Sequence, residues 1–119
     1  MRFLSFIKTA ENQGPIPQEL EEAMGGFVEQ SLKNGSLVQT GGLAPSAKGI
    51  RARLAGGKVT VTDGPFAEAK EVIGGYAMLE ATSLESAKQI MVDFLELHRR
   101  HWPGFEAECE VRPVEFLAP

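Results

Sequence analysis

The stretch "GGYAMLEATSLESAKQIMVDFLELHRRH", residues 74–101, contains the two patterns that decide the fold. Its first eight residues alternate between two faces, with Tyr76 and Met78 on one and Ala77 and Leu79 on the other, which predicts a strand. Thr82 with Glu85 three residues later is a capping-box pattern, with Thr82 as the predicted N-cap of a helix. The apolar face of this helix is continued by Leu84, Ala87, Met91, Phe94, Leu95 and His98. The stretch therefore predicts a strand followed directly by an amphipathic helix.

The residues before this stretch predict a β-hairpin. Over residues 50–62, apolar side chains alternate with arginine, lysine and threonine on both sides of Gly56-Gly57. Two glycines can supply the positive φ angles of a tight hairpin turn. The predicted hairpin has one polar face.

Three further strands and one further helix are predicted on either side. Residues 2–8 predict a strand with apolar residues on both faces, and residues 17–34 predict a helix opened by a proline and closed by Asn34-Gly35. Residues 36–45 predict a strand in which Gly41-Gly42 marks a bulge. Residues 105–116 predict a last strand, with Cys109 and Val111 inward and Glu108, Glu110 and Arg112 on its other side.

This order of elements predicts an α+β fold, a two-layer sandwich of the ferredoxin-like kind. Two helices with one apolar stripe each can cover only one face of the sheet. The other face is predicted to combine Tyr76 and Met78 with charged residues, which is too apolar for bare solvent. We therefore expect a homodimer with a pocket between the two sheets.

Composition limits the classes of function. A chain of 119 residues with 43% hydrophobic and 24% charged residues predicts one soluble domain, residues 1–119. The formal net charge of −4 and the scattered basic residues argue against nucleic acid as a partner. No stretch has the length of a membrane span, and a single cysteine needs no oxidising compartment. The expected location is the cytoplasm.

Residues 61–87, "VTDGPFAEAKEVIGGYAMLEATSLESA", follow an arginine-bearing hairpin and precede "EVRPV" at 110–114. This pattern closely resembles the DGPF (DGPFAETKE) family of YCII-related proteins, with Ala69 where the family name spells threonine. The resemblance implies a dimeric α+β barrel in a small bacterial protein, and relatives often accompany extracytoplasmic-function sigma factors. Some YCII-like relatives have a histidine in the first helix that pairs with an aspartate. Residues 17–34 contain no histidine, so that mechanism is not indicated for this chain.

Asp63 is the leading candidate for chemistry. A carboxylate at a strand end, beside Gly64-Pro65 and under Phe66, can act as a general acid or base. The alternative is a turn in which this side chain bonds to backbone amides. Of the charged residues that follow, Glu68 is expected at the surface, whereas Lys70 and Glu71 directly precede a strand and can equally bind a ligand.

The predicted ligand site combines guanidinium groups with a phenol. Arg51 and Arg53 project from one strand face, and with Arg112 they can clamp a carboxylate or phosphate. The alternative is pairing of these arginines with Glu80, Glu108 or Glu110. Tyr76 can supply a hydroxyl donor or bury its ring in a dimer interface. The complete set of predicted ligand-binding residues is Arg51, Arg53, Phe66, Lys70, Glu71, Tyr76 and Arg112.

No cofactor or metal is predicted. His98 and His101 have a spacing that can bind a metal, but no third ligand is evident, and a role at the helix end is favoured. Cys109 is expected to be a core residue rather than a nucleophile. Two functions remain open: a protein that binds or converts a small anionic or oxygenated metabolite, and a non-catalytic regulatory protein associated with a sigma-factor system.

Overall fold

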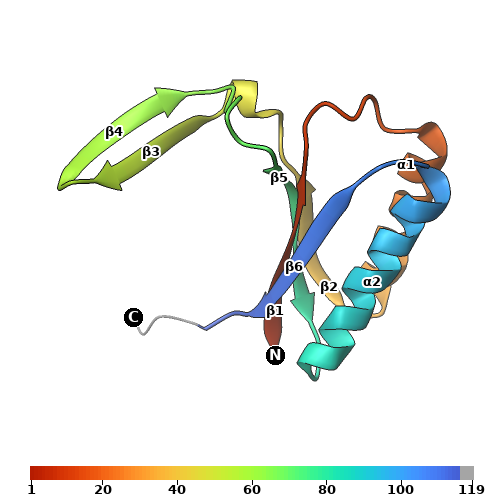
Figure 1. The fold of residues 1–119 in the computed structure, drawn as a ribbon. Helices are drawn as coiled ribbons and strands as arrows, with labels where there is room; N and C mark the ends of the chain where they lie inside the picture. The colour runs from red at the N-terminus through yellow and green to blue at the C-terminus, as the bar shows by residue number, and fades with distance from the viewer. Residues whose placement is uncertain (116–119) are drawn as a thin grey trace.

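Two helices and two antiparallel sheets make up the protein, as a computed structural model that describes residues 1–115 shows (Figure 1). The elements, in chain order, are β1 (Arg2–Thr9), α1 (Gln18–Lys33), β2 (Leu37–Gly42), the 3-10 turn η1 (Ser46–Lys48), β3 (Ile50–Ala55), β4 (Lys58–Asp63), β5 (Val72–Glu80), α2 (Leu84–His101) and β6 (Ala107–Pro113). The main sheet has the order β2-β5-β1-β6, and β3 and β4 form a second, two-stranded sheet. The α+β prediction is confirmed, and neither sheet closes into a barrel within residues 1–115.

The two helices lie together on one face of the main sheet (Figure 1). That face carries Phe3 and Leu79, which are directly opposite each other on β1 and β5 and are at most 2% exposed. They form the core with Leu37 and Ala87, and Leu20 of α1 is also fully buried. The other face has no helix on it. We call it the uncovered face; its apolar residues are Leu4, Phe6, Tyr76 and Met78, all half-buried.

The helix ends agree with the sequence except at one cap. In α1, Pro17 is the N-cap and Asn34 the C-cap, and Gly35 follows with a φ of 82°. In α2 the N-cap is Ser83, not Thr82 as predicted, because the Oγ of Ser83 accepts the Ser86 amide at 3.1 Å. Neighbouring hydroxyl residues offer the same capping group, so the sequence pattern did not distinguish them.

The bulge predicted at Gly41-Gly42 lies elsewhere. The register between β2 and β5 shifts between Leu37 and Gln39, and Gly41 is paired regularly with Tyr76. The aromatic ring needs the glycine, since a Cβ at Gly41 would lie 2.9 Å from the Tyr76 ring. Gly75 also packs closely, because a Cβ there would lie 3.1 Å from the carbonyl oxygen of Gly41.

The predicted hairpin is present, but it does not join the main sheet. Gly56 and Gly57 have φ angles of 59° and 74°, as a tight turn requires. We call β3 and β4 together, residues 50–63, the ribbon. It pairs only with itself and projects away from the main sheet (Figure 1). The prediction of one sheet face that carries Arg51, Arg53 and Tyr76 together is therefore wrong, because two sheets divide these residues.

The last strand is shorter than expected. β6 ends at Pro113, and Phe116, where the predicted strand ended, lies outside the described residues. Cys109 and Val111 face the helices, as predicted, since they pair with Ile7 and Ser5 of β1. Among residues 1–115, no helix has the length and apolar character needed to span a membrane.

The base of the ribbon is fixed to the rest of the protein through Ser46. The Ser46 Oγ donates to one Glu11 carboxylate oxygen at 2.5 Å, and the Ser46 amide donates to the other at 2.7 Å. The Phe66 amide donates to the same Ser46 Oγ at 3.1 Å, and the Gly64 amide donates to the Gly49 carbonyl at 2.9 Å. The "DGPF" loop is thus held against η1 and, through Glu11, against the loop after β1.

Acid is expected to loosen this attachment. The side-chain hydrogen bond from Ser46, and then the backbone one, hold the pKa of the Glu11 carboxyl below its ordinary value of 4.5. A lowered folded-state pKa stabilises the fold above the ordinary value and loses that effect as the pH falls through the folded-state pKa. We expect Glu11→Gln to lower the free energy of unfolding at pH 7 and to make little difference at pH 3. Urea unfolding at both pH values measures this, with the exposed Glu21→Gln as control. An equal loss at both pH values would contradict it.

Candidate functional site

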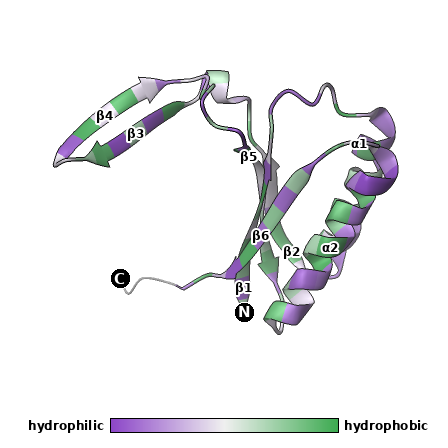
Figure 2. Ribbon diagram, viewed as in Figure 1, coloured by the Kyte–Doolittle hydropathy of each residue, from purple (hydrophilic) through white to green (hydrophobic). Residues whose placement is uncertain are grey.

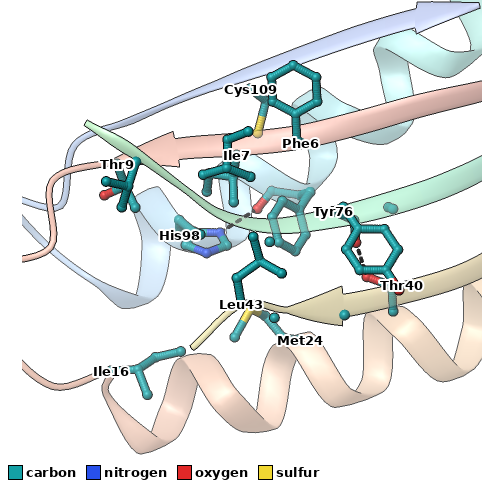
Figure 3. Close-up of a pocket in the computed structure, with 18 of the residues that line it drawn as sticks. Phe6, Ile7, Thr9, Ile16, Met24, Thr40, Leu43, Tyr76, His98 and Cys109 are labelled. Carbon is teal, nitrogen blue, oxygen red and sulfur yellow. Dashed lines mark hydrogen bonds between the residues drawn. The ribbon is translucent and has the colours of Figure 1, made fainter. Parts of the chain in front are cut away.

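A cavity of about 660 Å³ lies between the two helices and one end of the main sheet. It is found where β1 ends and β5 begins, beside the N-terminal half of α1 and the C-terminal half of α2 (Figure 3). Apolar side chains dominate its lining, among them Ile7, Ile16, Met24, Leu43 and Phe94. The volume is that of a pocket for a small organic molecule.

His98 is the main polar group in this cavity. Its side chain is 6% exposed, and its Nδ1 lies 2.9 Å from the carbonyl oxygen of Phe94. A carbonyl only accepts, so Nδ1 carries the hydrogen and donates it. The rings of Phe94 and Phe105, with centroids at 4.6 and 5.4 Å, hold the imidazole from two sides.

The second ring nitrogen of His98 is available to a ligand. Nε2 has no hydrogen-bond partner among residues 1–115, yet no side-chain nitrogen or oxygen there is both fully buried and unsatisfied. Nε2 therefore remains open to the space that His98 lines (Figure 3). A neutral imidazole with its hydrogen on Nδ1 offers an acceptor at Nε2, and a protonated one offers a donor.

The other polar side chains of the cavity differ in what they can still bind. Gln13 is fully engaged: it donates to Thr9 Oγ1 at 2.5 Å and to the Glu106 carbonyl at 2.8 Å, and its Oε1 accepts the Glu106 amide. Tyr76 lines the cavity as well, and its hydroxyl makes no hydrogen bond with any described residue. Tyr76 and His98 thus both have capacity for a ligand.

Cys109 also lines the cavity, but its thiol is unreactive. Burial raises the pKa of its thiol to about 11, so the thiol is protonated at neutral pH. This agrees with its interpretation as a packing residue.

The predicted site residues do not meet in one place within a single chain. Arg51 forms an ion pair with Glu68, and its guanidinium carbon lies 4.1 Å from the centre of the Phe66 ring. The guanidinium of Arg112 lies on β6, 3.1 Å from a Glu110 oxygen. Pairing with Glu110 was the alternative for Arg112, whereas the partner of Arg51 was not foreseen.

Four other predicted residues are exposed. Arg53 lies on the polar face of the ribbon, and Lys70 and Glu71 lie just before β5, as expected. Asp63 ends β4, and its side chain makes no hydrogen bond within residues 1–115. The turn is therefore held by backbone groups and by Ser46 rather than by the Asp63 carboxylate.

The two histidines, His98 and His101, lie in different environments. His98 is in the cavity, whereas His101 lies 3.8 Å from Glu19 at the start of α1. No group of three metal-ligating side chains is found in the described part of the chain. The sequence did place His98 on the apolar face of its helix. A polar ring on an apolar helix face indicates a residue that lines a cavity. The sequence-based interpretation placed His98 at the helix end instead.

Comparison with known protein families identifies the family of most of the chain. A protein-family model described as "YCII-related domain" matches residues 1–94, from β1 into the middle of α2. No curated protein matches the chain. The matched residues include most of the cavity lining, and His98, Phe105 and Cys109 follow them.

Proposed function

We propose that this chain, which belongs to the YCII-related domain family, is a homodimeric protein that binds a small anionic or oxygenated metabolite. The cavity carries the proposal: it has the volume of a small-molecule site, an apolar lining and a rigidly held imidazole with one free nitrogen. Such a site fits a mainly apolar molecule, aromatic or alicyclic, with a hydroxyl or carboxyl group that reaches His98 Nε2 or the Tyr76 hydroxyl.

The path of the chain supports the dimeric α+β barrel. The main sheet follows a β-α-β-β-α-β path with the order β2-β5-β1-β6, which is the ferredoxin-like arrangement. Both helices cover one face, and the uncovered face is left with four large apolar side chains. In a barrel made of two copies, these faces are turned toward each other across the barrel interior. We place this dimer in the bacterial cytoplasm.

The ligand has a second possible position in such a dimer. The sequence predicts a pocket between two sheets that is lined by Arg51, Arg53, Tyr76 and Arg112, with Asp63 at its mouth. One chain alone does not assemble them, so this pocket needs the second copy. Tyr76 belongs to both arrangements, because it lies on the uncovered face and also lines the cavity.

Filling the cavity is expected to weaken ligand binding. Gly25 of α1 lines the cavity and has no atom within 4 Å of an added Cβ, whereas Gly26 has the same open space but does not line it. Both substitutions to leucine replace a helix-interior glycine, which favours the helix. Gly25→Leu should therefore weaken ligand binding at least about tenfold without loss of stability, and Gly26→Leu should leave binding unchanged.

The measurement is isothermal titration with benzoate and phenol, the simplest anionic and oxygenated aromatic probes. His98→Leu is the second variant, and it should weaken binding of the same probes. If Gly25→Leu keeps full affinity and Arg53→Ala loses it, the ligand lies between the sheets. If neither probe binds the wild type, the proposal of a small aromatic ligand is wrong.

A non-catalytic regulatory role in a sigma-factor system is the second candidate. The observation that favours it is the exposed apolar side of the ribbon, which is a protein-binding surface by composition. Direct titration of the purified chain with an extracytoplasmic-function sigma factor from the same genome distinguishes the two. Tight binding there, with no response to either small probe, would favour the regulatory role.

A further inference from the structure

One face of the ribbon is entirely apolar except at its base. Ala52 lies opposite Val61 and Leu54 lies opposite Val59, so these side chains share a face with Ile50. The four large ones, Ile50, Leu54, Val59 and Val61, are 71%, 73%, 65% and 64% exposed. The alternation is visible along both strands in Figure 2. Arg51, Arg53, Lys58, Thr60 and Thr62 form the opposite face.

Nothing in residues 1–115 of the same chain covers this apolar face. β3 and β4 pair only with each other, and the ribbon stands away from the main sheet (Figure 1). The radius of gyration is 16.1 Å, compared with about 13.5 Å for a compact domain of this length. An isolated two-stranded ribbon is at best marginally stable in water. Its apolar face therefore needs a partner surface.

A second copy of the chain supplies a surface of matching size. A six-residue strand is about 20 Å long, and four strands side by side span about 14 Å, so one ribbon can cross a whole main sheet. The uncovered face offers Leu4, Phe6, Tyr76 and Met78 in a contiguous block on β1 and β5. Two exposed apolar surfaces of one chain are thus covered at once when two copies exchange their ribbons.

Charge also favours a second copy. The ribbon has three basic residues, Arg51, Arg53 and Lys58, and one acidic residue, Asp63, in a chain whose formal net charge is −4. The part of the chain outside the ribbon is therefore acidic as a whole, whereas Glu108 and Glu110 of β6, beside the uncovered face, already pair with Lys8 and Arg112. The basic ribbon of one copy is attracted to the acidic remainder of another.

We infer that the ribbon of each subunit docks its apolar face, Ile50, Ala52, Leu54, Val59 and Val61, on the uncovered face of a second copy. This inference rests on the proposed homodimer and specifies how it is held together. The contact is reciprocal, as a two-fold interface requires. The "DGPF" loop then has a defined task, because it sets the direction in which the ribbon leaves its own subunit.

Two neighbouring ribbon positions give a matched test. Val61→Glu places a carboxylate in the apolar contact, where its desolvation is costly, and should raise the dimer dissociation constant at least about 100-fold. Thr60→Glu adds the same charge one residue away on the opposite face of the ribbon. It should change the dimer dissociation constant less than about threefold. Sedimentation velocity over a concentration series measures both, with circular dichroism as the check on folding. A dimeric wild type that Val61→Glu leaves dimeric overturns the docking but not the homodimer. A monomeric wild type overturns both.

Photo-crosslinking gives a result even where Val61→Glu fails to fold. Leu54→Cys is introduced into a Cys109→Ser chain, and the new thiol is modified with a benzophenone maleimide. The modified chain is then mixed with 15N-enriched chains that carry no benzophenone. Crosslinks should join residue 54 to 15N peptides that contain residues 2–9 or 72–80. The label on Thr60→Cys should give none. Crosslinks only within one chain, or to the helices of the other chain, would overturn the inference.

Discussion

A Gly64→Ala variant is expected to be about 3 kcal/mol less stable than the wild type, the upper end of what overpacking costs. A Cβ at Gly64 would lie 1.7 Å from the Ser46 carbonyl oxygen and 2.7 Å from its carbon. Both are backbone atoms of η1, which Glu11 holds in place, so neither can move aside cheaply. The φ angle of Gly64 is not positive, so the need for glycine here is one of space.

Thermal and urea unfolding measure this effect, and the melting temperature should fall by about 10 °C or more. Gly49→Ala is the matched control, since its Cβ meets the same carbonyl at an ordinary 3.5 Å. Hydrogen exchange should also show faster exchange in the ribbon. If Gly64→Ala melts with the wild type, the "DGPF" loop does not depend on contact with Ser46.

Phe3→Ala is expected to have the largest effect on stability, about 4 kcal/mol. Phe3 is fully buried, and only five hydrophobic residues in the described chain are 7% exposed or less: Phe3, Leu20, Leu37, Leu79 and Ala87. Removal of the largest one leaves a cavity at the centre of the helix-covered face. A protein with so small a core has a low free energy of unfolding.

The control for Phe3→Ala is Phe6→Ala on the same strand. Phe6 is half-buried on the uncovered face, so its loss should weaken the dimer more than the subunit. Urea unfolding at two protein concentrations separates the effects. Phe3→Ala should lower the midpoint equally at both, and Phe6→Ala should lower it chiefly at the higher concentration, where the dimer forms. Equal behaviour of the two variants would contradict this assignment of the two faces.

Local sequence patterns predicted the elements well and their arrangement only in part. Alternation around Gly56-Gly57 and the apolar stripes of both helices depend on neighbours a few residues away, and these elements are confirmed. The direction of the ribbon depends on Glu11, Ser46 and Gly64, which are far apart in the sequence and show no periodicity. No strand or helix rule connects them.

The candidate site was harder to predict for the same reason. The cavity exists because loop residues such as Ile16 and Leu43 close one end of the space between helices and sheet. Arg51 meets Glu68 across 17 positions of loop and strand, a pairing that charge alone does not select. His98 is visible in the sequence as a polar ring on an apolar helix face, but it was interpreted as a helix-end residue and not as part of a site.

The hydrogen bond between Gly49 and Gly64 joins the two ends of the ribbon. The polypeptide leaves and re-enters the body of the protein at almost the same point, so its path through β2 and β5 does not depend on what lies between. Insertions or deletions within residues 50–63 change the reach of the ribbon and leave the main sheet intact. The part that the ribbon plays in the inferred association is therefore carried by a segment whose length can change without a change in the fold of the subunit.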